Sequence, residues 1–275
     1  MPLTELLLER RTAGAAAGAF TCYDVTTALG VARAAEARGV PAIVLLSEAS
    51  LRGASGRLLL SALLAVAREA RVPMCVQLDH VADDTLIDAA LAAGVGAVMA
   101  DGSRLPIREN SAFVAAVRGR AAVVGAGVEA ELGHIEGGED VAAATEAGTL
   151  TDPDQAAAFV AATGCDCLAV SIGNVHGTYA SPPRLDWERL ALIRDRVAVP
   201  LSLHGASGIP DADVRTAIGL GVCKINVNTE IRGRYLDELA ARLPAARDGL
   251  RLLELEAGLV DAVAAVVTAK LELLG

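Results

Sequence analysis

Residues 74–102, MCVQLDHVADDTLIDAALAAGVGAVMADG, decide the fold, because strand-like, helix-like and strand-like patterns follow one another there. The apolar run that begins at Met74 predicts a buried strand, and the apolar spacing of residues 83–93 predicts an amphipathic helix. Gly94 follows this helix as a C-terminal cap, and a second apolar run begins near Ala97. The stretch is therefore predicted to form a strand–helix–strand unit.

The same alternation extends along most of the chain. The strand candidates begin near Gly18, Pro41, Met74, Ala97, Val123, Leu168, Leu201 and Lys224. Helical spacing is found over residues 25–38, 83–93, 106–118, 152–162 and 211–220. Eight strands alternating with helices over about 250 residues predict a (β/α)8 TIM barrel, an α/β fold. A doubly wound open sheet is the alternative, and the absence of GxGxxG at any strand-to-helix turn disfavours it.

Two segments depart from a plain barrel. Residues 133–150 are polar, contain several glycines and are too long for an ordinary connection, which predicts a mobile active-site loop. Residues 235–275 are helical in pattern and exceed what closing the barrel needs. We expect an extra C-terminal helix there, either covering the barrel or packing against another subunit. The whole chain, residues 1–275, is expected to form a single domain.

The composition excludes several classes of protein. The net charge is −10 and no basic stripe appears, which argues against nucleic acid or an anionic membrane as a partner. No apolar run is long enough to span a membrane, and the N-terminus lacks the pattern of a secretory signal. The five cysteines form no CxxC pair, so a reducing, cytoplasmic compartment is expected.

Three of the four histidines follow strand-like runs, namely His80, His176 and His204. Catalytic groups of a TIM barrel lie at the C-terminal ends of its strands, so the three imidazoles are expected at one mouth. Neutral imidazole is the commonest zinc ligand, and three histidines with one open position are typical of a catalytic site. The pattern indicates a metal enzyme, although local hydrogen bonds would explain any single strand-end histidine.

Carboxylates are expected around the same mouth. Asp101 ends the fourth strand, and Glu129 and Glu131 lie two apart on the fifth and so share a face. Asp79 directly precedes the first of the three histidines, so we expect its side chain to point in a different direction. Glu139 lies in the long loop. As a ring around one mouth, these acids are candidates for general acid/base catalysis.

Two late segments are typical of phosphate binding. Residues 205–208, GASG, follow the seventh strand, and residues 226–229, NVNT, close the eighth strand and open a helix. Loops after strands seven and eight are the usual phosphate site of TIM barrels, where backbone N–H groups and a helix N-terminus contact the anion. Ordinary turn and capping chemistry is the alternative.

Seven stretches of the chain resemble the class II, zinc-dependent ketose-bisphosphate aldolases, in particular their tagatose- and fructose-bisphosphate aldolase branch. They are LDH (78–80), ADGS (100–103), VEAELG (128–133), GGED (137–140), HGTYAS (176–181), LHGASG (203–208) and KINVNTE (224–230). The resemblance implies a lyase of carbohydrate metabolism. Such an enzyme reversibly cleaves a ketose (bis)phosphate to dihydroxyacetone phosphate and an aldehyde, such as glyceraldehyde 3-phosphate. The cleavage passes through a metal-stabilised enediolate.

The resemblance also implies a role for individual residues. The catalytic Zn²⁺ would be bound by the three histidines, with Glu131 meeting it in an alternative position and Asp101 as a polar neighbour. Asp79 matches the acid/base residue for the aldehyde-derived hydroxyl, and Glu139 the loop acid that exchanges a proton on dihydroxyacetone phosphate. The positions that match substrate-binding residues are Ser47, Gly177, Gly205, Ala206, Ser207, Asn226, Asn228 and Thr229. A monovalent cation (Na⁺ or K⁺) and a homodimer or homotetramer are also implied.

Some positions depart from the family pattern, and other functions stay open. Thr21 and Leu45 lie where the family commonly has Asn and Gln at the border of the aldehyde site, so a non-standard aldehyde is an open alternative. His134 matches no family role and is expected to be a solvent-exposed loop residue. A Schiff-base aldolase using Lys224, a metal-dependent hydrolase and a non-catalytic sugar-phosphate-binding barrel are the competing functions. The first leaves the three histidines unexplained, and the second generally needs a histidine pair on an early strand.

Overall fold

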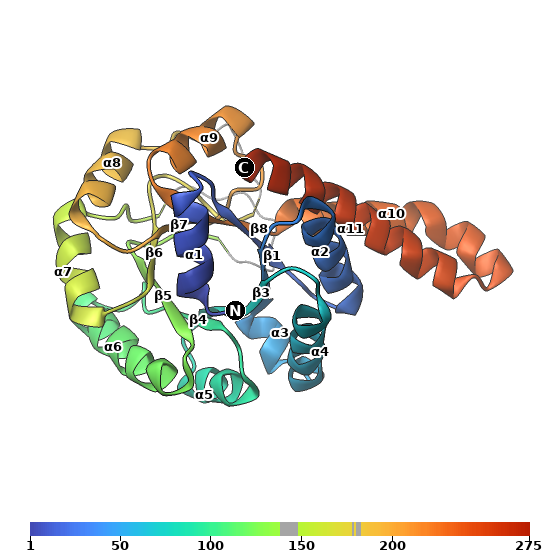
Figure 1. Cartoon of the computed structure of the whole chain (residues 1–275), viewed down its shortest axis with the longest axis horizontal. Coiled ribbons are helices and arrows are strands. Elements are labelled where there is room, and N and C mark those ends of the chain that lie inside the picture. Colours follow the sequence, from blue (N-terminus) through green and yellow to red (C-terminus); the bar gives the residue numbers. More distant parts are fainter. Residues whose placement is uncertain (138–147, 178, 180–182) are drawn as a thin grey trace.

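A computed structural model describes residues 1–137, 148–177, 179 and 183–275. Parallel strands β1 to β8 follow one another around a closed barrel (Figure 1). Their bounds are β1 Ala17–Thr21, β2 Ala42–Ser47, β3 Met74–Val81, β4 Ala97–Ala100, β5 Gly127–Leu132, β6 Cys167–Val170, β7 Leu201–Leu203 and β8 Val222–Val227. Pairing of β1 with β8, from Ala17 with Lys224 to Phe20 with Val227, closes the barrel. The predicted TIM barrel is confirmed, and the open sheet is wrong.

Helices surround this barrel on its outer side, apart from α1, which lies across one end of the barrel (Figure 1). Their bounds are α1 Leu3–Thr12, α2 Val25–Arg38, α3 Glu48–Arg52, α4 Gly56–Glu69, α5 Asp84–Ala93, α6 Ile107–Val124, α7 Pro153–Thr163, α8 Trp187–Arg196, α9 Asp211–Gly219, α10 Thr229–Gly249 and α11 Leu252–Leu274. The fifth strand begins later than expected, because α6 continues through Val123 and ends at the left-handed cap Gly125. The exposed Val123 side chain therefore belongs to a helix surface and not to the barrel.

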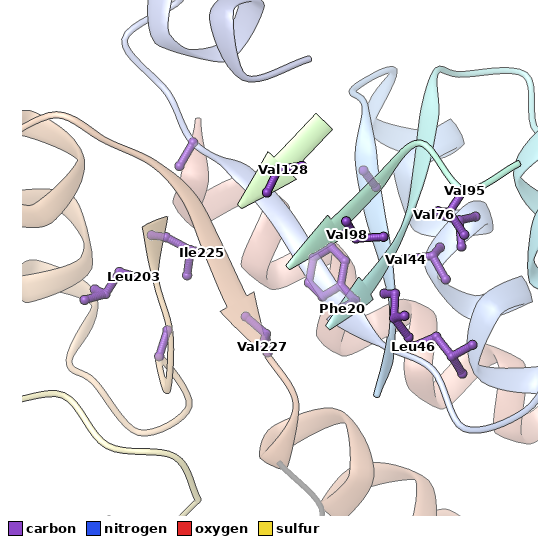
Figure 2. Close-up of a cluster of buried hydrophobic side chains, with 14 of the residues drawn as sticks. Phe20, Val44, Leu46, Val76, Val95, Val98, Val128, Leu203, Ile225 and Val227 are labelled. Carbon is purple, nitrogen blue, oxygen red and sulfur yellow. The ribbon is translucent and has the colours of Figure 1, made fainter. Parts of the chain in front are cut away.

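Residues of each strand alternate between the outside and the inside of the barrel. Figure 2 shows outward side chains, among them Phe20, Val44 and Val98, which pack beneath the surrounding helices. Their neighbours Ala19 and Ile43 point inward and form a separate apolar layer with Leu3, Leu6 and Leu7 of α1. Because α1 covers the N-terminal end of the barrel in this way, the open mouth lies at the C-terminal ends of the strands.

The C-terminal segment forms two helices, α10 and α11, so the chain has the expected extra helix beyond the one that follows β8 in the barrel. Helices α10 and α11 lie side by side and project from the barrel as a hairpin (Figure 1). The inner part of α11 packs on α2, where a Cβ atom on Gly30 would lie 2.5 Å from the Cγ1 atom of Val263. The extension thus covers one side of the barrel and leaves its tip exposed. Within the described ranges, no helix is both long and apolar enough to cross a membrane.

The two ends of the long loop after β5 lie together. The backbone N–H of His134 donates a hydrogen bond to the carbonyl oxygen of Thr149 at 2.7 Å. Residues 138–147 lie outside the described part of the chain. The predicted loop catalyst Glu139 is among them, so the structure describes only the base of this segment.

Candidate active site

The structure brings three imidazole rings together at the C-terminal mouth of the barrel. His80 lies on β3, His204 directly follows β7, and His176 lies in the loop after β6. The ring centroids of His80 lie 4.7 Å from His176 and 4.8 Å from His204. One nitrogen from each ring lies within 4.8 Å of the other two, so the three histidines could hold one metal ion.

An irregularity in β3 turns both Asp79 and His80 toward this mouth. Consecutive side chains of a regular strand point to opposite faces. His80, however, has a left-handed φ of 47°, and the pairing of β3 with β4 shifts register between Leu78 and Val81. Both Asp79 and His80 consequently line the mouth cavity, although the sequence predicted different directions. A left-handed non-glycine residue costs about 1–3 kcal/mol, and such strain is concentrated at functional sites.

The Asp101 carboxylate fixes one proton of His80. The Nδ1 atom of His80 lies 2.8 Å from Oδ2 of Asp101, and a carboxylate can only accept at that distance. Burial lowers the pKa of His80, but the hydrogen bond that His80 donates to Asp101 and the charges of Asp79, Asp101 and Glu131 outweigh it and raise this pKa well above its usual value. Burial raises the pKa of Asp101, and the hydrogen bond and charge of His80 outweigh that effect and lower it. The second nitrogen of His80, Nε2, faces His204.

Glu129 fixes the proton of His204 in the same way. The Nε2 atom of His204 lies 2.8 Å from Oε1 of Glu129, and both side chains are completely buried. This leaves Nδ1 of His204 as the atom 2.8 Å from Nε2 of His80. Two lone pairs cannot face each other at this separation without a cation between them. The donor set therefore fits either a shared proton or a metal ion.

A second group of possible ligands adjoins the first. Ligand atoms of His80, Asp101 and Glu131 lie within 4.8 Å of one another. The Oε1 atom of Glu131 accepts a hydrogen bond from the backbone N–H of Ile135 at 2.9 Å. Its other oxygen, Oε2, is buried, lies 3.8 Å from Nδ1 of His80 and has no hydrogen-bond partner among the described residues. An uncompensated buried carboxylate oxygen of this kind suits a cation.

Asp79 also lines the mouth. Its carboxylate is completely buried, and the Nδ2 atom of Asn226 lies 3.4 Å from Oδ2 and 3.5 Å from Oδ1. The same Nδ2 atom lies 3.3 Å from Nδ1 of His204. Asp79 thus adjoins the histidine cluster, in a position from which it could exchange a proton with a ligand bound there.

The loops after β6, β7 and β8 meet at one side of the mouth. Gly205 has a φ of 64°, and a Cβ atom there would lie 1.9 Å from the carbonyl oxygen of Val175. The hydroxyl of Tyr179 donates to the carbonyl of Gly205 at 2.9 Å. At the N-terminus of α10, the backbone N–H of Glu230 donates to Oγ of Ser207 at 3.4 Å. The expected phosphate-binding residues on these loops are therefore neighbours, and Gly177, Ala206, Asn226, Asn228 and Thr229 belong to the same segments.

A cavity of about 360 Å³ opens beside His80 and His176. This is enough room for a small sugar phosphate. The residues that line it are Ser47, Glu48, Ala49, Arg52, Asp79, His80, Asp101, Arg104, His134, Ile135, Gly137 and His176. Arg52 is paired with Glu48 and Asp83. Arg104 has no carboxylate partner within the described ranges, and it also lines a neighbouring cavity of about 360 Å³ beside Phe113.

His134 is not the solvent-exposed loop residue that the sequence predicted. Its side chain is 16% exposed and lines the mouth cavity. Nδ1 of His134 lies 3.0 Å from Oγ of Ser103 and 3.7 Å from Oε1 of Glu131. The hydrogen bond and charge of Glu131 raise the pKa of His134. The left-handed Gly133 turns the chain back over the mouth, and no pattern in the sequence indicates that turn.

Lys224 is not placed as a Schiff-base lysine would be. It is completely buried, with Nζ 2.9 Å from Oε2 of Glu129 and 2.5 Å from Oδ1 of Asn226. Burial lowers its pKa, but the charge of Glu129 outweighs this and the pKa is raised. A nucleophilic lysine needs a lowered pKa, so this geometry disfavours the Schiff-base alternative.

Comparison with known proteins identifies the family of this chain. The model of the family "Fructose-bisphosphate aldolase class-II" matches residues 1–275. The D-tagatose-1,6-bisphosphate aldolase subunit GatY of Klebsiella oxytoca is 40% identical over 239 residues, which cover 85% of this chain and 83% of GatY.

Two solved structures share the fold over nearly the whole chain. The crystal structure of the YdjI aldolase from Escherichia coli K12 has a TM-score of 0.89 at 33% identity, covering 99% of this chain and 96% of that one. A putative fructose-1,6-bisphosphate aldolase from Coccidioides immitis has a TM-score of 0.90 at 31% identity, covering 99% and 95%.

Proposed function

Because this chain belongs to the class II fructose-bisphosphate aldolase family, and is therefore an aldolase, a lyase, we propose that it is zinc-dependent and cleaves a ketose (bis)phosphate reversibly. The products would be dihydroxyacetone phosphate and an aldehyde. The observation that carries the proposal is the convergence of His80, His176 and His204, whose ligand nitrogens lie within 4.8 Å of one another and could hold one metal ion. Zn²⁺ suits imidazole ligands and, when bound, supplies a Lewis acid that stabilises negative charge on a ketone oxygen.

The buried Asp79 is proposed as the acid/base residue of the carbon–carbon bond cleavage. It would accept the proton of the C4 hydroxyl as the bond breaks and return it in the aldol direction. The Nδ2 atom of Asn226 lies 3.4 Å and 3.5 Å from its two oxygens, and the carboxylate lines the mouth cavity, where a substrate hydroxyl could approach it. Glu139, which lies outside the described residues, is proposed as the base that exchanges a proton on dihydroxyacetone phosphate.

The phosphate of the ketone half is proposed to bind at the loops after β6, β7 and β8. Gly205 and Ser207 lie there beside the N-terminus of α10, where backbone N–H groups favour an anion. The residues proposed for this half are Gly177, Gly205, Ala206, Ser207, Asn226, Asn228 and Thr229, with a monovalent cation nearby.

The aldehyde half is proposed to occupy the mouth cavity beside Ser47. Arg104 contributes positive charge to this cavity, whereas the charge of Arg52 is balanced by Glu48 and Asp83. The Arg104 guanidinium favours an aldehyde with an anionic group such as the phosphate of glyceraldehyde 3-phosphate. Thr21 and Leu45 lie at the aldehyde-side positions where the family commonly has Asn and Gln. The side-chain amides of the family are therefore missing there, and the test should include aldehydes other than glyceraldehyde 3-phosphate.

Two further properties complete the proposal. A homodimer or homotetramer is proposed, because the α10–α11 hairpin projects beyond the barrel with exposed leucines such as Leu250 and Leu253 (Figure 1). A cytoplasmic location is proposed, because the cysteines Cys22, Cys75, Cys165, Cys167 and Cys223 are all free and buried.

The decisive experiment offers the purified protein a panel of aldehydes with dihydroxyacetone phosphate, with and without a chelator. We expect aldol product with at least one aldehyde, loss of activity after chelation, and recovery with Zn²⁺. Undiminished activity after chelation, together with borohydride trapping of a covalent adduct on Lys224, would refute the zinc mechanism.

A further inference from the structure

A cluster of buried polar side chains lies directly beneath the histidines. Gln77 of β3, Glu129 of β5 and Lys224 of β8 are completely buried, and Asn226 of β8 is nearly so. All four point into the barrel between the apolar layer at its closed end and the metal-ligating atoms at its mouth. Burying an ammonium and a carboxylate is costly, and such pairs often add no net stability. The cluster therefore calls for a role in the chemistry above it.

The two oxygens of Glu129 have different partners. Oε2 accepts hydrogen bonds from the Nζ ammonium of Lys224 at 2.9 Å and from the Nε2 amide of Gln77 at 2.5 Å. Oε1 is thereby left to face Nε2 of His204 at 2.8 Å. Since the proton of His204 lies on that side, its Nδ1 atom carries the lone pair that points into the mouth.

Lys224 also determines how the Asn226 amide is turned. Its ammonium can only donate, and it lies 2.5 Å from Oδ1 of Asn226. The amide nitrogen of Asn226 must then point the other way, toward Asp79 and His204. The ammonium of Lys224 thus contacts both Glu129, which orients His204, and Asn226, whose amide N–H points toward Asp79.

We propose that Lys224 is a positioning residue, whose ammonium directs Oε1 of Glu129 to His204 and the amide N–H of Asn226 to Asp79. Lys224 would thus orient the surroundings of the metal ligand His204 and of the acid/base residue Asp79 at the same time, without contacting substrate. This inference rests on the proposed function only in taking His204 as a metal ligand and Asp79 as the acid/base residue. The orientation of the side chains is testable in the metal-free protein.

The test uses the lysines, of which the chain has two, Lys224 and Lys270. Lys224→Met removes the charge and the donors at similar length, and Lys270→Met is the matched control, since Lys270 pairs with Glu230 near the surface. Because the chain has 4 histidines, ¹⁵N-histidine NMR of the metal-free protein at mildly alkaline pH can report each imidazole separately. Zinc affinity is measured by competition with a chromogenic chelator.

We expect Lys224→Met to lower zinc affinity about 10–100-fold, as is usual when the partner of a metal ligand is disturbed. We also expect it to remove the neutral Nε2–H signature of His204, with both quantities unchanged in Lys270→Met. Glu129→Gln is the second variant, and it serves even if Lys224→Met fails to fold. Lys224 and Gln77 would hold the new amide oxygen, its NH₂ group would face His204, and the His204 proton would move to Nδ1.

Wild-type zinc affinity and an unchanged His204 signal in Lys224→Met would overturn the inference, as would an Nε2–H signal in Glu129→Gln. Failure of the wild-type protein to bind zinc would refute the proposed function instead. The two failures are distinguishable, because the imidazole spectra are recorded without metal.

Discussion

The Nε2 atom of His80 lies 2.8 Å from the Nδ1 atom of His204, although the two residues are 124 positions apart in the chain. Asp101 holds the proton on the far side of one ring, and Glu129 holds it on the far side of the other. The two carboxylates thus leave both near nitrogens directed at one point. Barrel closure brings these rings together, and the carboxylates decide which of their atoms meet.

His204→Ala is expected to abolish both zinc content and aldol cleavage. The ring is completely buried and supplies Nδ1 to the cluster, so neither solvent nor a neighbour can replace it easily. Metal analysis of the purified variant and a coupled cleavage assay check the two effects. Circular dichroism should show a folded barrel, and a variant that keeps full activity would remove His204 from the metal site.

Glu139→Ala is expected to slow proton exchange at dihydroxyacetone phosphate by about 100-fold or more, with zinc still bound. Loss of a positioned general base typically costs about 10²–10⁴-fold in rate. Exchange of the substrate proton with deuterium from solvent, followed by NMR, measures this step without the aldehyde. Glu136→Ala in the same loop is the control, and equal exchange rates in Glu139→Ala and wild type would mean that the base lies elsewhere.

The sequence was sufficient to predict the fold because strand and helix periodicities alternate with clear caps. Residues 25–38 form α2 as expected, since Asp24 and Gly39 cap both ends. The one misplaced strand start, near Val123, has a local reason. Val-Val continues a helix there, and only Gly125 ends it, so this apolar pair on a helix surface has the same local pattern as the beginning of a strand.

The sequence was sufficient to predict which residues form the site, but not the direction in which each side chain points. Strand alternation placed Glu129 and Glu131 on one face, and both do point into the barrel. It failed at His80, because a register shift and a left-handed residue turn two successive side chains inward. The cavity position of His134 and the contacts of Lys224 also depend on tertiary structure, which periodicity does not contain.

Arg104→Gln is expected to raise the KM for a phosphorylated aldehyde about 10–100-fold. A charge-assisted hydrogen bond contributes about 1.5–3 kcal/mol, and Arg104 lines the cavity in which the aldehyde is proposed to bind. Proton exchange of dihydroxyacetone phosphate alone should be unchanged, because the ketone half binds at the loops after β6, β7 and β8. Arg57→Gln is the control, because Arg57 is an exposed residue of α4. An equal KM in Arg104→Gln and wild type would assign the anionic group to other residues.

The stabilisation of the protein by zinc is expected to increase with pH above the usual histidine pKa of about 6.5. In the metal-free protein the pKa of His80 is raised by Asp101 and the surrounding carboxylates, against the opposing effect of burial. The folded state therefore holds this proton more tightly than the unfolded state. The stability that this His80 proton contributes is fully present below the pKa of His80 in the unfolded state. It is lost as pH rises through the pKa of His80 in the folded state.

Zinc binding has the opposite dependence, because the metal needs the neutral ring and competes with the proton between His80 and His204. The difference in Tm between zinc-loaded and metal-free protein should thus widen over this pH range. Asp101→Asn removes the carboxylate that raises the pKa of His80, so the widening should begin at lower pH in that variant. Thermal melts with and without zinc across a pH series measure both effects, and a Tm difference that is independent of pH would contradict the competition.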